Sequence, residues 1–97
     1  MRIYKYPIKD CMPSSDTCAE TTIKVPSGSK ILCATGMMRP NGLYRDIVVY
    51  IQHGISTIGE ERTLCVVPTG DSDAPVCQKY IGTVLLDGWY VAHVFEK

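Results

Sequence analysis

Short apolar runs separated by turn-forming residues extend along the whole chain of 97 residues. Turn signals recur at close intervals, among them Pro26-Ser27-Gly28-Ser29, Arg39-Pro40-Asn41-Gly42 and Pro68-Thr69-Gly70-Asp71. The runs between them are rich in Val, Ile, Thr and Tyr and have the composition and length of strands. The pattern predicts an all-β protein, a small antiparallel β-sandwich or open barrel of about six to seven strands.

Two kinds of strand are expected. The segment 20–25 alternates, with Thr21, Ile23 and Val25 on one face, which indicates a half-buried strand. Three other runs are apolar on both faces: residues 31–34, 47–51 and 63–67. Such runs are typical of central strands that are covered on both sides, or of strands that hide one face in a subunit contact.

The C-terminal segment predicts a hairpin about Asp87-Gly88, because Asp-Gly between apolar runs favours a two-residue type I′ turn. That turn would place Leu86 opposite Trp89 and Gly82 opposite His93. Both faces of the hairpin would be largely apolar, and one of them would meet another chain. His93 would then be a core or interface residue bonded to backbone, with a functional role as the alternative.

The chain length predicts one β domain over residues 1–97, with a loop insertion at residues 10–19. Residues 10–19 and 71–76 are expected to be the least ordered stretches. Ten basic residues balance ten acidic ones, which disfavours general nucleic-acid binding. Neither a signal peptide nor a membrane span is visible, so the expected location is the cytoplasm.

Five cysteines occur at positions 11, 18, 33, 65 and 77. Their odd number and the cytoplasmic prediction favour free thiols over a disulfide framework, although Cys11 and Cys18 are available to pair under oxidation. Cys33 and Cys65 lie inside apolar runs and are expected to be small buried hydrophobes.

No motif predicts an enzyme, a cofactor or a metal site. The cysteines lack short metal-ligand spacings, and His53 and His93 are the only histidines. No loop or neighbouring acid singles out one cysteine as a nucleophile. Glu60 and Glu61, beside Arg62, are expected on a solvated surface rather than in a cleft.

Tyr4 and Tyr6 alternate with Lys5 on the first expected strand, so both rings lie on one face. This face could stack a base or line a protein contact, and core packing is the alternative. Cationic and aromatic residues elsewhere complete the candidate binding set: Tyr4, Lys5, Tyr6, Lys24, Lys30, Arg45, Trp89, Tyr90 and His93.

Three stretches together resemble a family of short, functionally uncharacterised β-proteins of phages, prophages and bacteria. They are Ile3-Tyr4-Lys5-Tyr6-Pro7-Ile8, residues 23–32, and Tyr80-Ile81-Gly82-Thr83 with His93-Val94-Phe95-Glu96. The chain departs from that pattern in its insertion after the first strand and in having fewer tryptophans over residues 37–55. The resemblance implies a compact β-fold and a phage or mobile-element origin, and it implies no catalytic residue.

These observations lead to three functional hypotheses. The first is a non-enzymatic, phage-encoded binding protein that forms a homo-oligomer and inhibits or sequesters a host defence factor in the host cytoplasm. The second is a nucleotide-binding sponge for a small signalling molecule. The third is a structural or accessory phage protein whose edge strands pair with another chain.

Overall fold

A computed structural model describes five stretches of the chain: residues 2–8, 19–38, 44–69, 79–86 and 90–97. For Met38, Tyr44, Arg45 and Tyr90 it describes the backbone alone. Seven strands account for most of these residues: β1 (Ile3–Ile8), β2 (Ala19–Pro26), β3 (Lys30–Met38), β4 (Tyr44–Gln52), β5 (Gly59–Pro68), β6 (Lys79–Leu86) and β7 (Tyr90–Glu96). The described residues contain no helix, and the predicted all-β class is confirmed.

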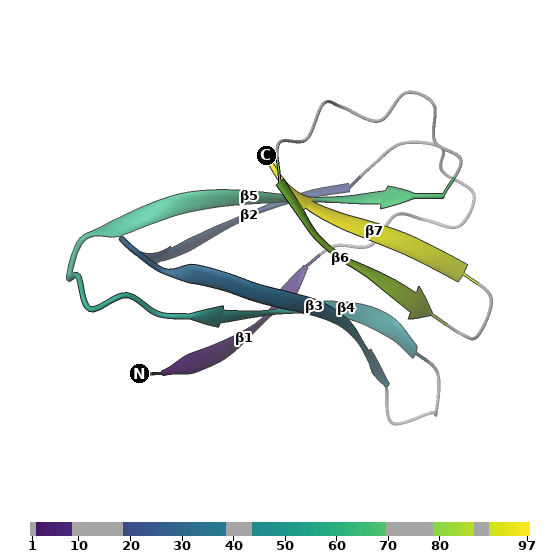
Figure 1. Ribbon diagram of the computed structural model, residues 1–97, viewed down its shortest axis with the longest axis horizontal. Coiled ribbons are helices and arrows are strands. Elements are labelled where there is room, and N and C mark those ends of the chain that lie inside the picture. Colours follow the sequence, from purple (N-terminus) through teal and green to yellow (C-terminus); the bar gives the residue numbers. More distant parts are fainter. Residues whose placement is uncertain (1, 9–18, 39–43, 70–78, 87–89) are drawn as a thin grey trace.

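The strands form two antiparallel sheets, as Figure 1 shows. The first has the order β1-β4-β3 and the second the order β2-β5-β7-β6. The sheets pack face to face in the manner of a small sandwich, and β3 and β6 approach each other closely where the two sheets meet along one side. A Cβ atom on Gly82 of β6 would lie 3.7 Å from the Cβ of Ala34 on β3.

The hydrophobic core lies between the two sheets and takes side chains from both. The first sheet contributes Ile8, Ile31, Ile47, Val49 and Ile51, and the second contributes Val25, Leu64, Val66, Val84, Leu86, Ala92 and Val94. The two middle strands β4 and β5 are also buried on the side facing away from the core, where Val48 is 2% exposed and Cys65 is 0% exposed. A single chain therefore covers these residues without a subunit contact. Their burial gives no support to the predicted oligomer, which stays a prediction.

The alternation predicted for residues 20–25 is confirmed, since Val25 is buried and Lys24 and Glu20 are exposed. The expectation that residues 31–34 form a central strand is wrong, because β3 is an edge strand. A β-bulge between Ile31 and Cys33 inserts one extra residue and reverses the side on which the later side chains point. Cys33 is consequently exposed, whereas Cys65 is buried as predicted.

The predicted register of the last hairpin is also wrong. Leu86 pairs with Tyr90 and Thr83 pairs with His93, and a bulge between Tyr80 and Gly82 then restores the expected partner at the far end of the hairpin. Because of this shift by one residue, one face of the hairpin is the core face. Its side chains, which all point into the core, are Val84, Leu86, Ala92 and Val94. The predicted Asp87-Gly88 turn itself lies outside the described residues, as do the two stretches expected to be least ordered, apart from Ala19, which begins β2.

The strand β1 contains a proline at a position that the ladder tolerates. The His53 N–H donates to the Arg2 carbonyl at 2.9 Å, so Arg2, Tyr4 and Tyr6 direct their backbone groups toward β4. Pro7 is at an alternate position, where the backbone nitrogen points away from β4 and would donate no ladder bond in any case. A proline there costs no ladder bond and protects the edge against pairing with another strand.

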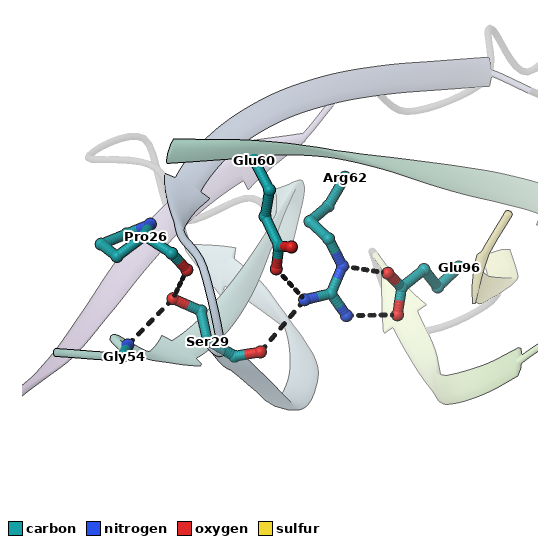
Figure 2. A network of polar contacts seen from close by, with 6 residues as sticks. All are labelled: Pro26, Ser29, Gly54, Glu60, Arg62 and Glu96. Atoms are coloured by element: carbon teal, nitrogen blue, oxygen red, sulfur yellow. Dashed lines mark hydrogen bonds and ion pairs between the residues drawn. The ribbon is translucent and has the colours of Figure 1, made fainter. Parts of the chain in front are cut away.

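Arg62 joins the two sheets at the end of the core. It lies on the core side of β5, opposite Ile23 of β2, and it donates to both carboxylate oxygens of Glu96 on β7, through its Nη2 at 2.8 Å and through its Nε (Figure 2). Its Nη1 donates to the Ser29 carbonyl at 3.0 Å, beside the start of β3, and to Glu60 at 3.4 Å. Glu61, expected on a solvated surface, is exposed, whereas the neighbouring Arg62 side chain is only 19% exposed.

The same network holds the loop between β4 and β5 against the turn between β2 and β3. The buried Ser29 hydroxyl donates to the Pro26 carbonyl at 2.5 Å and accepts from the Gly54 N–H at 3.0 Å (Figure 2). The Ser27 N–H donates to the Ile58 carbonyl at 2.7 Å. Gly54 lies so close to the turn that a Cβ atom would be 2.3 Å from the Ser27 carbonyl oxygen.

We predict that Gly54→Ala lowers the free energy of unfolding by about 1–3 kcal/mol or more, because the new methyl group has backbone atoms rather than a flexible side chain in its way. Gly82→Ala is the matched control, since its methyl group would make an ordinary contact with Ala34. Urea unfolding measures both. A Gly54→Ala protein as stable as the Gly82→Ala protein would contradict the close approach.

We predict a specific loss of stability in acid from the Arg62–Glu96 pair. The hydrogen bonds from Arg62 lower the pKa of Glu96 below its usual value of 4.5. The pair therefore stabilises the fold fully above that value, and its contribution is lost as the pH falls through the lower, folded-state pKa.

Between about pH 7 and pH 3, the wild type should lose about 1–3 kcal/mol more unfolding free energy than Glu96→Gln. Glu61→Gln, which alters an exposed carboxylate, should follow the wild type. Urea unfolding at a series of pH values tests this, and parallel curves for the wild type and Glu96→Gln would refute it.

Candidate functional site

A hollow of roughly 310 Å³ opens at the end of the first sheet where the N-terminal end of β1 meets the β4–β5 loop. Arg2, Tyr4, His53, Gly54 and Ile55 line it. The rings of Tyr4 and His53 lie against each other with their centroids 4.3 Å apart and their planes tilted by 32°. Figure 1 shows that the start of β1, the β2–β3 turn and the β4–β5 loop all lie at this end of the molecule. The hollow is thus lined by the start of β1 and the β4–β5 loop, and the Arg62 network holds that loop against the β2–β3 turn.

The polar groups of the hollow are cationic or neutral. Arg2 donates to the Tyr4 hydroxyl at 3.4 Å, and this hydrogen bond raises the pKa of Arg2 above its usual value. A hydrogen bond between the His53 Nε2 and the Tyr6 hydroxyl holds the imidazole in place. No carboxylate lines the hollow among the described residues. The arrangement can therefore accept a ring or an apolar side chain, with an anionic group beside Arg2.

Two isoleucines of the β4–β5 loop are exposed at this end. Ile55, on the rim of the hollow, is fully exposed, and Ile58 is 70% exposed. Hydrogen bonds from Gly54 and to Ile58 tie the loop to the β2–β3 turn, so these side chains are presented on a fixed backbone. Two exposed isoleucines on one fixed loop, beside the hollow, form a candidate contact surface.

The structure brings together only part of the predicted binding set. Tyr4 and Tyr6 lie on one face of β1 and both contact His53. Lys5 is exposed on the other face of β1. Lys24 is exposed on β2, opposite Glu61, and Lys30 is exposed at the start of β3.

Three further members of the predicted set cannot be placed in a site. Arg45 belongs to β4 and Tyr90 to β7, but their side chains lie outside the described part of the structure. Trp89 lies outside it altogether.

His93 lies on the outer face of the second sheet, far along the chain from the hollow. Thr69 donates its hydroxyl to the Val91 carbonyl at 3.2 Å, and a carbonyl can only accept, so the Thr69 oxygen accepts from His93 Nε2 at 2.9 Å. In the neutral imidazole the other nitrogen, Nδ1, then accepts from the Thr83 hydroxyl at 3.0 Å. Thr83 in turn accepts from Tyr80 at 2.6 Å.

Both ring nitrogens of His93 are thus occupied by threonine hydroxyls rather than by the backbone partner that we predicted. The chain of hydrogen bonds includes no carboxylate among the described residues. It fixes the imidazole on the sheet surface and leaves no free ring nitrogen for a ligand.

Sequence reasoning missed two residues that define the site, His53 and Arg62. His53 is positioned by the pairing of β1 with β4, and its partners Tyr4 and Tyr6 precede it by more than 40 residues, as the separation of 47 between Tyr6 and His53 shows. Arg62 and Glu96 are separated by 34 residues. The signal available in the sequence was the Tyr-x-Tyr alternation, and it identified one half of each ring contact.

No group of three His, Cys, Asp or Glu side chains in the described stretches is arranged to hold a metal ion. None of the described residues forms a helix that is long and apolar enough to cross a membrane.

Comparisons with known proteins place the chain in a family but show no activity. A family model described as a domain of unknown function, DUF7352, matches residues 1–97. Neither the curated proteins nor the solved structures contain a significant match. The expectation of an uncharacterised family is confirmed at that level, and the chain belongs to the family of domains of unknown function DUF7352.

Proposed function

We propose that the protein is a non-enzymatic binding protein whose partner contacts the hollow and the exposed isoleucines beside it. The observation that carries this proposal is the full exposure of Ile55 on the rim of a hollow lined by the rings of Tyr4 and His53. Apolar and aromatic anchors beside an arginine are the composition of the energetic centre of many protein interfaces.

The rigidity of this surface supports the proposal. A loop that must be ordered on binding reduces the affinity by the entropy of ordering it. Here the hydrogen bonds of Gly54 and Ser27 and the contact of His53 with Tyr6 order the loop before any partner arrives. The binding surface is therefore preorganised.

We further propose that the partner is a host protein. The chain would then be a phage-encoded inhibitor that binds and sequesters this partner in the cytoplasm of the host cell. The support for this finer statement is the resemblance of the Ile-Tyr-Lys-Tyr-Pro and Tyr-Ile-Gly-Thr motifs to those of short phage and prophage proteins. The balanced charge of the chain, with ten basic and ten acidic residues, agrees with a protein partner rather than a nucleic acid.

The test compares the host proteins that two variants capture. Each variant places one charge on an exposed apolar position. Ile55→Asp alters the rim of the hollow, and Leu85→Asp alters the outer face of β6, where Leu85 is 57% exposed. We expect host proteins that the wild type and Leu85→Asp retain to be depleted about tenfold or more on Ile55→Asp. Quantitative mass spectrometry of the captured proteins measures this, and equal retention by all three proteins would contradict the proposed surface.

The stacked pair of Tyr4 and His53 with Arg2 beside it favours a second candidate, the binding of a small nucleotide. A base could lie against the rings while Arg2 holds a phosphate. Nucleotide monophosphates, cyclic nucleotides and ADP-ribose should then raise the melting temperature of the wild type. Tyr4→Ala should abolish the shift, and Tyr80→Ala, which removes an exposed ring from the other sheet, should keep it. No shift with any of these compounds at millimolar concentration would exclude this candidate.

A further inference from the structure

The strand β2 has an edge that no other strand covers in the described sheet. The direction of its backbone groups follows from one hydrogen bond, that of the Ser27 N–H to the Ile58 carbonyl. Because bonding alternates along an antiparallel pair, Thr21, Ile23 and Val25 bond to β5. The alternate residues, Glu20, Thr22, Lys24 and Pro26, therefore direct their backbone groups outward.

The outward groups of Glu20, Thr22 and Lys24 are available for pairing. Within the described part of the chain, no backbone hydrogen bond links these three residues to another segment. Their side chains are all exposed on the outer face of the sheet. Pro26 has no N–H, so the usable edge ends there.

This short edge is complementary to itself. If a second copy of β2 runs antiparallel with Thr22 on the two-fold axis, each Glu20 lies directly opposite a Lys24 of the other copy. The residues that face each other are then the ones whose backbone groups point outward, so every pair can exchange both of its hydrogen bonds. The carboxylate and ammonium groups form opposite-charge pairs across the axis, and the two Thr22 hydroxyls meet at its centre.

Neighbouring registers lose these advantages. An axis at Glu20 would bring two carboxylates together, and an axis at Lys24 would bring two ammonium groups together. A register moved by one residue toward Pro26 would oppose Glu20 to Pro26, which offers no donor. Lys24 also makes no ion pair among the described residues, whereas Glu20 is held in place by Lys97 at 2.9 Å.

We propose that two copies of this chain pair through β2, with Thr22 on the two-fold axis and Glu20 opposite Lys24 of the second copy. The two four-stranded sheets become one continuous sheet across the axis. The interface is isologous, so it closes with two subunits. It is separate from the hollow, and it does not depend on the proposed function.

The experiment measures mass against concentration by sedimentation velocity for the wild type and a charge-exchange series. The wild type should form a dimer. Lys24→Glu alone should raise the dissociation constant about 10- to 100-fold, because both symmetric pairs become repulsive. The double variant Glu20→Lys with Lys24→Glu should restore the dimer, since the charges are exchanged and remain complementary.

Two further variants locate the interface. Thr22→Pro removes an outward N–H and the side-chain hydrogen bond to Thr63 but no backbone bond to β5. It should give a monomer, in a strand that already carries a proline at an outward position. Lys5→Glu changes the charge on β1, an edge strand of the other sheet, and should leave the dimer intact. Thermal unfolding of each variant confirms that it is folded.

A wild type that remains a monomer at the highest attainable concentration would overturn the proposal. So would a dimer that tolerates Lys24→Glu and Thr22→Pro equally, or a double variant that stays a monomer while it is folded. Because the charge-exchange pair tests the register directly, the result does not depend on whether the proline variant folds.

Discussion

The guanidinium group of Arg62 is the interaction on which the architecture of one end of the sandwich depends. The core is made of aliphatic side chains, and it ends where Arg62 and Glu96 occupy core-facing positions of β5 and β7. A planar group with several donors suits this place, because it donates at once to the Glu96 carboxylate of its own sheet and to the Ser29 carbonyl in the turn that leads to the opposite sheet. A lysine would supply the charge but not the fork that joins the two sheets.

The influence of this ion pair reaches the surface through backbone contacts. The Ser29 hydroxyl accepts from the Gly54 N–H and donates to the Pro26 carbonyl, so the β2–β3 turn holds the β4–β5 loop in place. Since that loop bears both His53 and Ile55, the shape of the hollow is decided by a network whose charged members do not line it. The end of the core, the β2–β3 turn and the loop that lines the hollow are thus connected by one series of hydrogen bonds.

Much of the fold followed from local patterns, and the exceptions have a common physical cause. The alternation over residues 20–25 and the continuous apolar runs of β4 and β5 predicted their burial, because each depends on the period of two along a strand. The bulges after Ile31 and after Tyr80 break that period, and a single inserted residue leaves no trace in the hydrophobic pattern. The exposure of Cys33 was unpredictable for this reason. The partner of His93 was predicted wrongly because Leu86 pairs with Tyr90, one residue later than a two-residue turn would give. Arg62, Glu96 and His53 meet their partners only through the order of strands in the sheets, which no local pattern encodes.

Prolines on two of the edge strands, β1 and β2, also affect how the protein behaves at high concentration. Pro7 and Pro26 occupy outward-facing positions, where a strand of another molecule would need an amide hydrogen to pair. Neither of these two edges therefore offers an uninterrupted row of donors. Cross-β growth requires long, flat edges that accept strand after strand. The sandwich can therefore carry aliphatic strands of nine or ten residues, such as β4 and β5, without offering a template for fibril growth along these two edges.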